Sequence, residues 1–413
     1  MSAVDGLTGP AIRDPGRWST LSDCKRVLVV VHTVVYGQRL KDVFELLRSD
    51  LRIHVRFTIA PHAFNPGVGA FLTALDAQVL PWSEAVTEEY DLVLAAGSQG
   101  LEQLRGPLLR IPHGAGHMKL SGPSGAARRG VSGLARDFLM IGDRVVPAAY
   151  ALAHRDDLAL LSRSCPEALP IAEVVGDASY DRIARSLGRR DEYRRALGLR
   201  DGEKLVLVCS TWGLGSSFNR LEALLPRVLA DLDPADGFRT YLLLHPNAWA
   251  GHGGWQVRAW LAGDGRQAVQ PIAPDVDWRP LLVAADAVIG DHGSLTLYAA
   301  MCDVPIVMAR FPGQDVNPHS PGAALAALAP AISLTHSLSR QLRYARDHYD
   351  RRAYRRIAAR ISSEPGRFNG RMRRLMYRLL ELGEPAHEPE TRELDLPDPL
   401  PPPVASAEGG GSP

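Results

Sequence analysis

The chain has 413 residues, of which 46% are hydrophobic and 23% charged, and its formal net charge is +1. This length and apolar content predict two globular domains of ordinary size. The near-neutral charge excludes a field over the whole surface that would attract nucleic acid or anionic lipid, so any such contact must be local.

Four widely spaced cysteines contain no Cys-x-x-Cys pair. Their spacing indicates neither a zinc site nor a disulfide framework, so we expect no metal site and a reducing compartment. Residues 1–23 lack an apolar signal segment, and no apolar run elsewhere is long enough to span a membrane. We therefore expect a cytoplasmic protein.

In the first half of the chain, short Val/Ile/Leu runs alternate with amphipathic stretches. Residues 1–24 are expected to form a flexible extension and residues 25–180 the first domain. We predict strands at 26–32, 53–60, 77–80, 92–96, 108–112, 138–141 and 172–175, and helices at 39–48 and 67–75. Such alternation is typical of a parallel sheet with crossover helices.

The second half repeats the same alternation. Residues 181–203 are predicted to form an Arg-rich helix and linker, and residues 204–340 the second domain. We predict strands at 204–209, 240–244, 268–272, 287–290 and 304–308, and helices at 220–231, 254–262, 278–285 and 294–301. Basic helices are expected at 341–382 and a disordered tail at 383–413, which is poor in apolar residues. The predicted fold class is α/β, with two doubly wound Rossmann-like domains.

In open α/β sheets ligands bind beyond the carboxyl ends of the strands, and the most informative such segment is Asp291-His292-Gly293-Ser294. It follows an apolar strand and precedes a helix. Gly293 allows close approach of the backbone, Ser294 can cap the helix, and the helix N-terminus offers free N–H groups to a pyrophosphate. The alternative interpretation is an ordinary turn with a good N-cap residue.

A second segment, His245-Pro246-Asn247, follows another buried strand. Pro246 prevents further ladder pairing and leaves His245 at the rim of the sheet. A histidine there can donate to a phosphate or act as an acid or base. A solvated loop histidine is equally compatible with the sequence.

A third segment places Ser210, Thr211 and Trp212 after the first strand of the second domain. Hydroxyls and free N–H groups in such a loop suit phosphate oxygens. The glycines that follow match neither G-x-G-x-x-G nor a P-loop, so a flexible polar loop is the alternative.

The fourth segment, His113-Gly114, follows a strand of the first domain. The glycine leaves the backbone free to bring His113 close to a hydroxyl nucleophile, as a general base requires. The alternative is a structural histidine beside a turn. Because all four segments follow strands and the histidines are distributed over both domains, we predict a site in a cleft between the domains.

This ordered set of motifs resembles the CDP-glycerol glycerophosphotransferase family over about residues 109–308. The corresponding segments are His113-Gly114, Gly176-Asp177-Ala178-Ser179-Tyr180-Asp181, Ser210-Thr211-Trp212, His245-Pro246 and Asp291-His292-Gly293-Ser294. The resemblance implies the GT-B fold, in which two doubly wound Rossmann-like domains face a cleft. The chain departs from the family at Ala115, where the family has Thr, and at His292-Gly293, where it has Tyr-Ser.

The resemblance also implies transfer of a glycerophosphate-like or glycosyl group from a CDP- or UDP-type donor to an acceptor hydroxyl, in cell-envelope polymer biosynthesis. No metal or cofactor is required, because positioning and electrostatics suffice. His113 and His245 are the implied catalytic residues. The implied donor-binding residues are Ser210, Thr211, Trp212, Asn247, Asp291, His292, Gly293 and Ser294, and the acceptor-side residues are Gly114 and Asp177.

Two other functions stay open. The UDP-N-acetylglucosamine 2-epimerases, also of GT-B fold, use an Asp-Ser-Gly turn similar to Asp291 to Ser294. Their His-Arg-Arg-Glu-Asn segment is replaced here by Thr211-Trp212-Gly213-Leu214. The third candidate is a non-catalytic GT-B-like protein that binds RNA or another anion, although nucleic acid is the less favoured partner.

The stretch 340–378 is rich in arginine, with apolar residues interleaved. One interpretation is an amphipathic helix on anionic lipid at the inner face of a membrane, where a lipid-linked or polymeric acceptor would be found. Binding to nucleic acid is a second interpretation. Packing of this helix across the domains is the third, and it is the favoured one.

Overall fold

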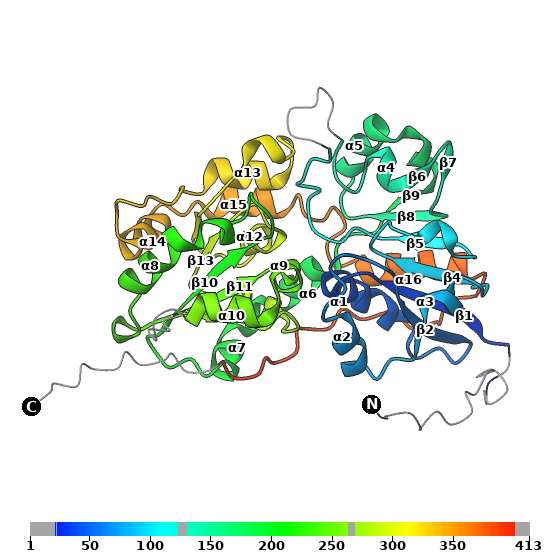
Figure 1. Cartoon of the computed structure of the whole chain (residues 1–413), viewed down its shortest axis with the longest axis horizontal. Helices are drawn as coiled ribbons and strands as arrows, with labels where there is room; N and C mark the ends of the chain where they lie inside the picture. Colours follow the sequence, from blue (N-terminus) through cyan, green and yellow to red (C-terminus); the bar gives the residue numbers. More distant parts are fainter. Residues whose placement is uncertain (1–20, 22, 123–129, 263–268, 401–413) are drawn as a thin grey trace, which may run out of the picture.

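The computed structural model describes residues 21, 23–122, 130–262 and 269–400. Two parallel sheets lie side by side, each with helices on both faces (Figure 1). In Figure 1 the first half of the chain is drawn in blue to cyan-green and the second half in green to yellow. The predicted alternation of strands and helices is therefore present in both halves.

The first sheet has seven parallel strands in the order β3-β2-β1-β4-β5-β8-β9. They are β1 (Lys25–Val31), β2 (Ile53–Ile59), β3 (Val79–Leu80), β4 (Leu92–Ala95), β5 (Leu108–Arg110), β8 (Ala149–Leu152) and β9 (Ala172–Val174). The helices that connect them include α1 (Val34–Phe44), α2 (Val68–Ala74), α3 (Trp82–Ala85) and α5 (Asp156–Ser164). The strand order reverses between β1 and β4, which makes their carboxyl ends a topological switch point.

One prediction for the first half was wrong, and one strand was missed. Residues 138–141 do not form a strand of the sheet, because they end α4 (Arg136–Leu139) and continue as the short β6 (Met140–Ile141), which pairs only with β7 (Arg144–Val145). Strand β8 was not predicted. Its sequence Ala-Tyr-Ala-Leu is fully buried but contains two alanines, which have little preference for strands.

The second sheet has five parallel strands in the order β12-β11-β10-β13-β14. They are β10 (Lys204–Ser210), β11 (Phe238–Leu244), β12 (Gln270–Pro271), β13 (Ala287–Gly290) and β14 (Ile306–Met308). The surrounding helices include α8 (Leu221–Asp231), α9 (Pro246–His252), α10 (Gly254–Ala262), α11 (Trp278–Ala284), α12 (Ser294–Ala299) and α13 (Pro321–Leu328). Here the order reverses between β10 and β13, so two of the predicted binding segments follow the strands of a switch point.

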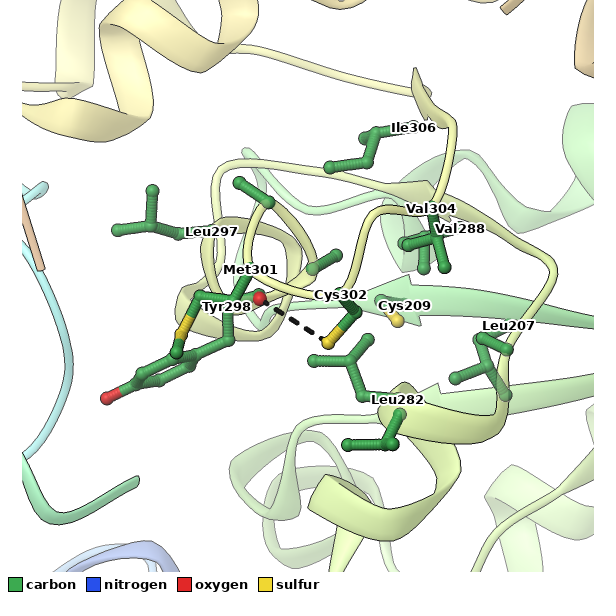
Figure 2. Packing of buried hydrophobic residues seen from close by; sticks show 14 of the residues in the cluster. Leu207, Cys209, Leu282, Val288, Leu297, Tyr298, Met301, Cys302, Val304 and Ile306 are labelled. Atoms are coloured by element: carbon green, nitrogen blue, oxygen red, sulfur yellow. Dashed lines mark hydrogen bonds between the residues drawn. The ribbon is translucent and has the colours of Figure 1, made fainter. Parts of the chain in front are cut away.

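Helix α12 lies on a closely packed core, which Figure 2 shows. Cys302 follows the helix and is packed among Leu207, Leu282 and other apolar side chains of the second domain. The Cys302 thiol donates to the carbonyl of Tyr298 at 3.9 Å. This packing fixes the helix that begins at Ser294.

The two sheets are connected by α6 (Ala178–Ser186) and α7 (Arg190–Ala196), in agreement with the predicted Arg-rich helix. Two arginines of α7 bind one carboxylate beside the second sheet. The distances to Asp286 are 2.6 Å from Arg190 and 2.7 Å from Arg194. The arginines of this segment thus anchor the connection.

The basic stretch 340–378 forms three helices, α14 (Leu338–Asp347), α15 (Arg351–Ala358) and α16 (Phe368–Leu379). Their apolar sides are buried: Leu342 and Tyr354 belong to cores of the second domain, whereas Met372 belongs to the core of the first. Many of the arginines bind carboxylates, in the pairs Arg351 and Arg355 with Asp303, Arg367 and Arg371 with Glu364, Arg373 and Arg374 with Glu384, and Arg378 with Glu173. The stretch therefore packs against both domains, in agreement with the third interpretation, although it forms three helices rather than one.

Residues 383–400, predicted to be disordered, pack along α6 and α7. Leu394 is only 1% exposed, its N–H donates to Ser186 Oγ at 2.9 Å, and its carbonyl accepts from Tyr193 Oη at 2.9 Å. One buried leucine in a polar stretch gives too weak a compositional signal to predict such an anchor. The rest of the predicted tail, 401–413, lies outside the described residues.

Candidate active site

The predicted first-domain and second-domain loops contact each other directly. The backbone N–H of Ala115 donates to Ser294 Oγ at 3.2 Å, and a Cβ atom on Gly114 would lie 2.8 Å from the same oxygen. A side chain at Gly114 would therefore push the loop off the start of α12. Gly114, predicted on the acceptor side, is required here for close approach of the two domains.

Asp291 organises the loop that follows β10. Its Oδ2 accepts from Thr211 N (2.9 Å), Thr211 Oγ1 (3.0 Å) and Ser217 N (2.9 Å), and its Oδ1 accepts from Gly293 N (3.1 Å). Asp291 is 1% exposed. We predicted that Asp291 contacts the donor, but its carboxylate already binds the protein's own N–H and O–H groups, so its role is to shape the loop.

The hydroxyls of Ser210 and Thr211 are also engaged inside the protein. Ser210 Oγ donates to the carbonyl of Thr211 at 3.0 Å and accepts from Phe218 N at 2.8 Å. This differs from the predicted contact of both hydroxyls with a pyrophosphate. Trp212, the third predicted residue of this segment, remains 37% exposed.

His245 caps the N-terminus of α9. Its Nδ1 accepts a hydrogen bond from the backbone N–H of Asn247 at 3.1 Å. Asn247, predicted to bind the donor, thus contacts His245 through its backbone. Burial, with help from the charge of Lys119 and from the neighbouring His113, lowers the pKa of His245 to about 3. A neutral ring that accepts at Nδ1 carries its proton on Nε2, so His245 is a hydrogen-bond donor at neutral pH.

His113 is neutral as well. Burial lowers its pKa to about 3, and the positive charges of Arg110 and Lys119 act in the same direction. Its ring lies 5.0 Å from the ring of Tyr36, centroid to centroid. Because the imidazole is uncharged, one of its nitrogens has a lone pair that can accept a proton.

A series of rings connects His113 to His245 across the domain boundary. It consists of Tyr36, His62, Phe64 and Trp212, which we call the aromatic row. Successive centroids along it are separated by 6.3 Å, 5.7 Å and 5.1 Å, and Trp212 lies 6.3 Å from His245. The first three members come from the first domain and Trp212 from the second, so the candidate site is lined from both sides.

Lys119 acts electrostatically on three of the histidines, and sequence reasoning missed it. Its Nζ is 4.8 Å from the centroid of the Trp212 ring, and its charge lowers the pKa of His113, His245 and His292. Burial lowers the pKa of Lys119 itself. The charge of Asp291 acts in the opposite direction and raises the pKa of Lys119.

His292 and Gly293 form the turn before α12, and the charge of Lys119 acts on His292. His292 is 6% exposed, its Nδ1 has no hydrogen-bond partner among the described residues, and burial lowers its pKa despite the opposing charge of Asp291. A Cβ atom on Gly293 would lie 2.6 Å from Thr211 Cγ2. The glycine thus lets the turn pack against the loop after β10.

Asp177, the second predicted acceptor-side residue, braces the two domains. Its carboxylate caps α6 through Tyr180 N at 2.7 Å, and it binds Arg39 Nη2 at 2.6 Å and Tyr298 Oη at 2.8 Å. The side chain is fully buried. Because its oxygens bind three elements of the protein, Asp177 positions α1 against α12, and its place on the acceptor side stays a prediction.

Among the described residues, no three His, Cys, Asp or Glu side chains gather where they could hold a metal ion. In the same part of the chain, no helix has the length and hydropathy that crossing a membrane requires.

No protein-family model matches the chain, and no curated protein matches it. Among solved structures it is similar to the wall teichoic acid polymerase TagF, with 11% identity over 87% of this chain and 90% of that chain and a TM-score of 0.57. A TagF variant soaked with CDPG gives 13% identity, coverage of 86% and 89%, and a TM-score of 0.58. MnaA from S. aureus, solved with UDP, gives 13% identity, coverage of 90% and 100%, and a TM-score of 0.53.

These likenesses define the class of fold. The molecule has a GT-B type fold built from two doubly wound Rossmann-like domains, as the motifs predicted. The resemblance to the CDP-glycerol glycerophosphotransferases, and more distantly to the UDP-N-acetylglucosamine 2-epimerases, is confirmed at the level of fold.

Proposed function

We propose that this protein is a GT-B transferase that moves a glycerophosphate-like or glycosyl group from a CDP- or UDP-type donor to an acceptor hydroxyl. The proposal depends above all on the arrangement of His113 and His245. These two neutral histidines come from opposite domains and share one partly buried cation, Lys119, as neighbour. Such a site suits a reaction in which negative charge develops on a phosphate while a hydroxyl loses its proton.

The second domain supplies the donor side. Lys119, although carried by the first domain, extends over Trp212 and can neutralise a pyrophosphate together with the Nε2–H of His245. The free N–H groups at the start of α12 and the buried Nδ1 of His292 lie on the same side of the boundary. Trp212 offers a partly exposed indole face for apolar contact with the nucleoside.

In the proposed step, the neutral imidazole of His113 takes the proton of the acceptor hydroxyl as its oxygen attacks. With a phospho-alditol donor, an O–P bond forms at the β-phosphorus and the P–O bond to the nucleoside monophosphate breaks. With a glycosyl donor, a C–O bond forms at the anomeric carbon and a nucleoside diphosphate leaves. In both cases the negative leaving group is stabilised by Lys119 and His245.

The alternatives predict other behaviour. An epimerase needs no acceptor, and the segment that the 2-epimerases carry after the first strand of the second domain is replaced here by the loop at Thr211 and Trp212. A non-catalytic RNA-binding protein would bind RNA in a strongly salt-dependent way. The stretch that suggested RNA binding is mostly paired with carboxylates within the fold.

The direct test is a thermal-shift screen of CDP-, UDP-, GDP- and dTDP-linked donors, followed by titration calorimetry. We expect stabilisation by at least one CDP- or UDP-linked compound, because ligands that bind only the folded state raise its unfolding temperature. If calorimetry shows that folded protein binds none of the four classes, the proposed function is wrong.

A further inference from the structure

Residues 383–400 run from the first domain to the second, as the red trace in Figure 1 shows. At the start of this segment, the carbonyl of Gly383 accepts a hydrogen bond from Arg52 Nη2 of the first domain at 2.9 Å. At its end, Leu400 packs against a core of the second domain, and its N–H donates to the carbonyl of Leu197 at 3.1 Å. We call residues 383–400 the C-terminal strap. The strap links the domains in addition to the connection through α6 and α7.

One leucine anchors the strap. Of residues 383–400, Leu394 alone is buried, and its side chain belongs to a core of the second domain. Its N–H donates to Ser186 Oγ and its carbonyl accepts from Tyr193 Oη, both at 2.9 Å. Leu396, two residues further along, is 57% exposed. The strap is therefore held at one defined position, where α6 ends and α7 passes.

Acidic residues on both sides of Leu394 face arginines of this connection. Glu393 Oε2 lies 2.8 Å from Arg189 Nη1, and the carbonyl of Glu393 accepts from Arg182 Nη2 at 3.1 Å. Asp395 lies 3.7 Å from the same guanidinium. The two carboxylates are largely or partly exposed, so salt screens these ion pairs and each contributes little. The buried leucine provides most of the attachment, and the charges align the strap on the helices.

The helix to which the strap binds also holds the two domains together. Arg182 of α6 donates to Asp42 Oδ1 on α1 at 3.1 Å, and Asp42 Oδ2 accepts from Arg279 on α11 at 2.8 Å. Asp42 is buried. Asp177, the N-cap residue of α6, binds both α1 and α12. Helix α6 thus positions a helix of the first domain against two helices of the second.

The segment that returns from α15 to α16 is fixed on α6 as well. The carboxylate of Asp181 accepts from the N–H groups of Gly366 at 2.7 Å and Phe368 at 3.0 Å, where α16 begins. Asp181 is buried. Helix α6 therefore binds both the segment by which the chain re-enters the first domain and the strap by which it leaves again.

We propose that the C-terminal strap keeps the candidate site assembled, because it holds α6 in the position that places the two domains against each other. Its release at Leu394 would loosen the boundary at which the Ala115 N–H meets Ser294 Oγ. Release does not require unfolding of either domain, since the strap contains no helix or strand and buries one side chain. The strap is a conformational device of the fold, and it does not depend on the proposed transferase activity.

The test is hydrogen–deuterium exchange of the full chain, followed in peptides that cover residues 113–119 and 294–299. Leu394→Ala should raise exchange in both peptides by about tenfold or more, because the buried anchor of the strap is lost. Exchange within β1 and β10 should stay unchanged, which shows that both sheets remain folded. Leu396→Ala is the matched control and should exchange like the unmodified protein. Equal exchange at 113–119 in the two leucine variants would overturn the proposal.

A milder variant decides the question if Leu394→Ala loses protection in β1 or β10 as well. Glu393→Lys reverses the charge beside Arg189 at a partly exposed position and should raise exchange at 113–119 by about two- to fivefold. Glu390→Lys makes the same change of charge on the strap at an exposed position with no ion pair among the described residues, and it should have no effect. If Glu393→Lys raises exchange in α6 and α7 but not at 113–119, the strap only covers these helices and the proposal is wrong.

These measurements contain no nucleotide donor. Their failure would therefore leave the proposed transferase function to its own ligand screen, and a failed ligand screen would leave the role of the strap unaffected.

Discussion

Lys119 and Trp212 meet across the domain boundary, with the ammonium nitrogen 4.8 Å from the centroid of the indole. Lys119 follows β5 of the first domain, whereas Trp212 follows β10 of the second. The contact lies within the group of histidines whose pKa values the lysine lowers. We propose that Lys119 neutralises the donor phosphates. This positive charge comes from the first domain, whereas the other donor-side groups belong to the second.

Replacing this lysine should weaken donor binding. Lys119→Met keeps most of the side-chain volume but removes the charge, so we expect the donor Kd to rise by about 10- to 100-fold, as for loss of a charge-assisted hydrogen bond. Titration calorimetry with the donor from the ligand screen measures this. Lys204→Met is the matched control, because Lys204 lies 5.0 Å over the ring of Phe238 at the other end of β10. Equal Kd values for the two variants would argue against the role of Lys119.

His113 should be needed for chemistry and not for donor affinity. Loss of a general base typically slows the chemical step by about 10²- to 10⁴-fold, and His113→Ala should lower kcat within that range while the donor Kd changes little. Steady-state kinetics and calorimetry together separate the two quantities. His54, an exposed histidine of β2, provides the control variant His54→Ala. If His113→Ala instead abolishes donor binding, His113 belongs to the donor side.

Donor binding should take up protons. In the free protein the pKa values of His113 and His245 are lowered to about 3 from the ordinary 6.5. Phosphate charge beside His245 favours its imidazolium form, so the pKa of His245 rises in the complex, and affinity should increase as the pH falls from 7 toward 5. Calorimetry at pH 6 in buffers of different ionisation enthalpy measures the uptake. The variant His245→Asn should show none.

The stability of the free protein should decrease as the pH falls, whereas the donor affinity should increase. A histidine whose pKa is lower in the folded state binds fewer protons there than in the unfolded chain, so its contribution is complete above about 6.5 and is lost as the pH falls. His32 adds to this effect, because burial lowers its pKa to about 4. Thermal unfolding between pH 7 and pH 4 should show a falling midpoint, and a midpoint constant over this range would contradict the burial of these rings.

Asp291 should contribute to stability and to the shape of the donor loop. Asp291→Asn places an NH₂ group against the N–H groups of Thr211, Ser217 or Gly293, so we expect a loss of about 2 kcal/mol or more in the free energy of unfolding. Urea unfolding measures this loss. Asp275→Asn, at an exposed position, should leave the free energy of unfolding nearly unchanged. A smaller loss for Asp291→Asn than for the control would contradict the hydrogen bonds described here.

Much of the fold could be predicted because its strands are continuous apolar runs bounded by turns. The strand at 287–290 and the helix at 254–262 were predicted with the bounds that the structure shows. Strand β8 could not be found in this way, because Ala149 and Ala151 have no β preference and its place in the sheet is decided by its neighbours β5 and β9.

The sequence allowed the candidate site to be located, but it did not allow the roles of the individual residues to be assigned. Motif spacing placed the loops at the switch point, since this follows from strand order. Motif spacing could not show that the carboxylates of Asp291 and Asp177 accept hydrogen bonds from N–H, O–H and guanidinium groups of the protein. These partners come from distant parts of the chain. Lys119 belongs to no recognisable motif, and only the contact between domains gives it a role.

Helix α16 has a consequence for how the protein is made. Its side chains Phe368, Met372 and Leu375 complete the core of the first domain, whose strands lie some two hundred residues or more earlier in the chain. A ribosome that has just released the first domain's strands has therefore not yet synthesised the helix that covers them. The core of the first domain therefore cannot be completed until α16 has been synthesised, long after its strands.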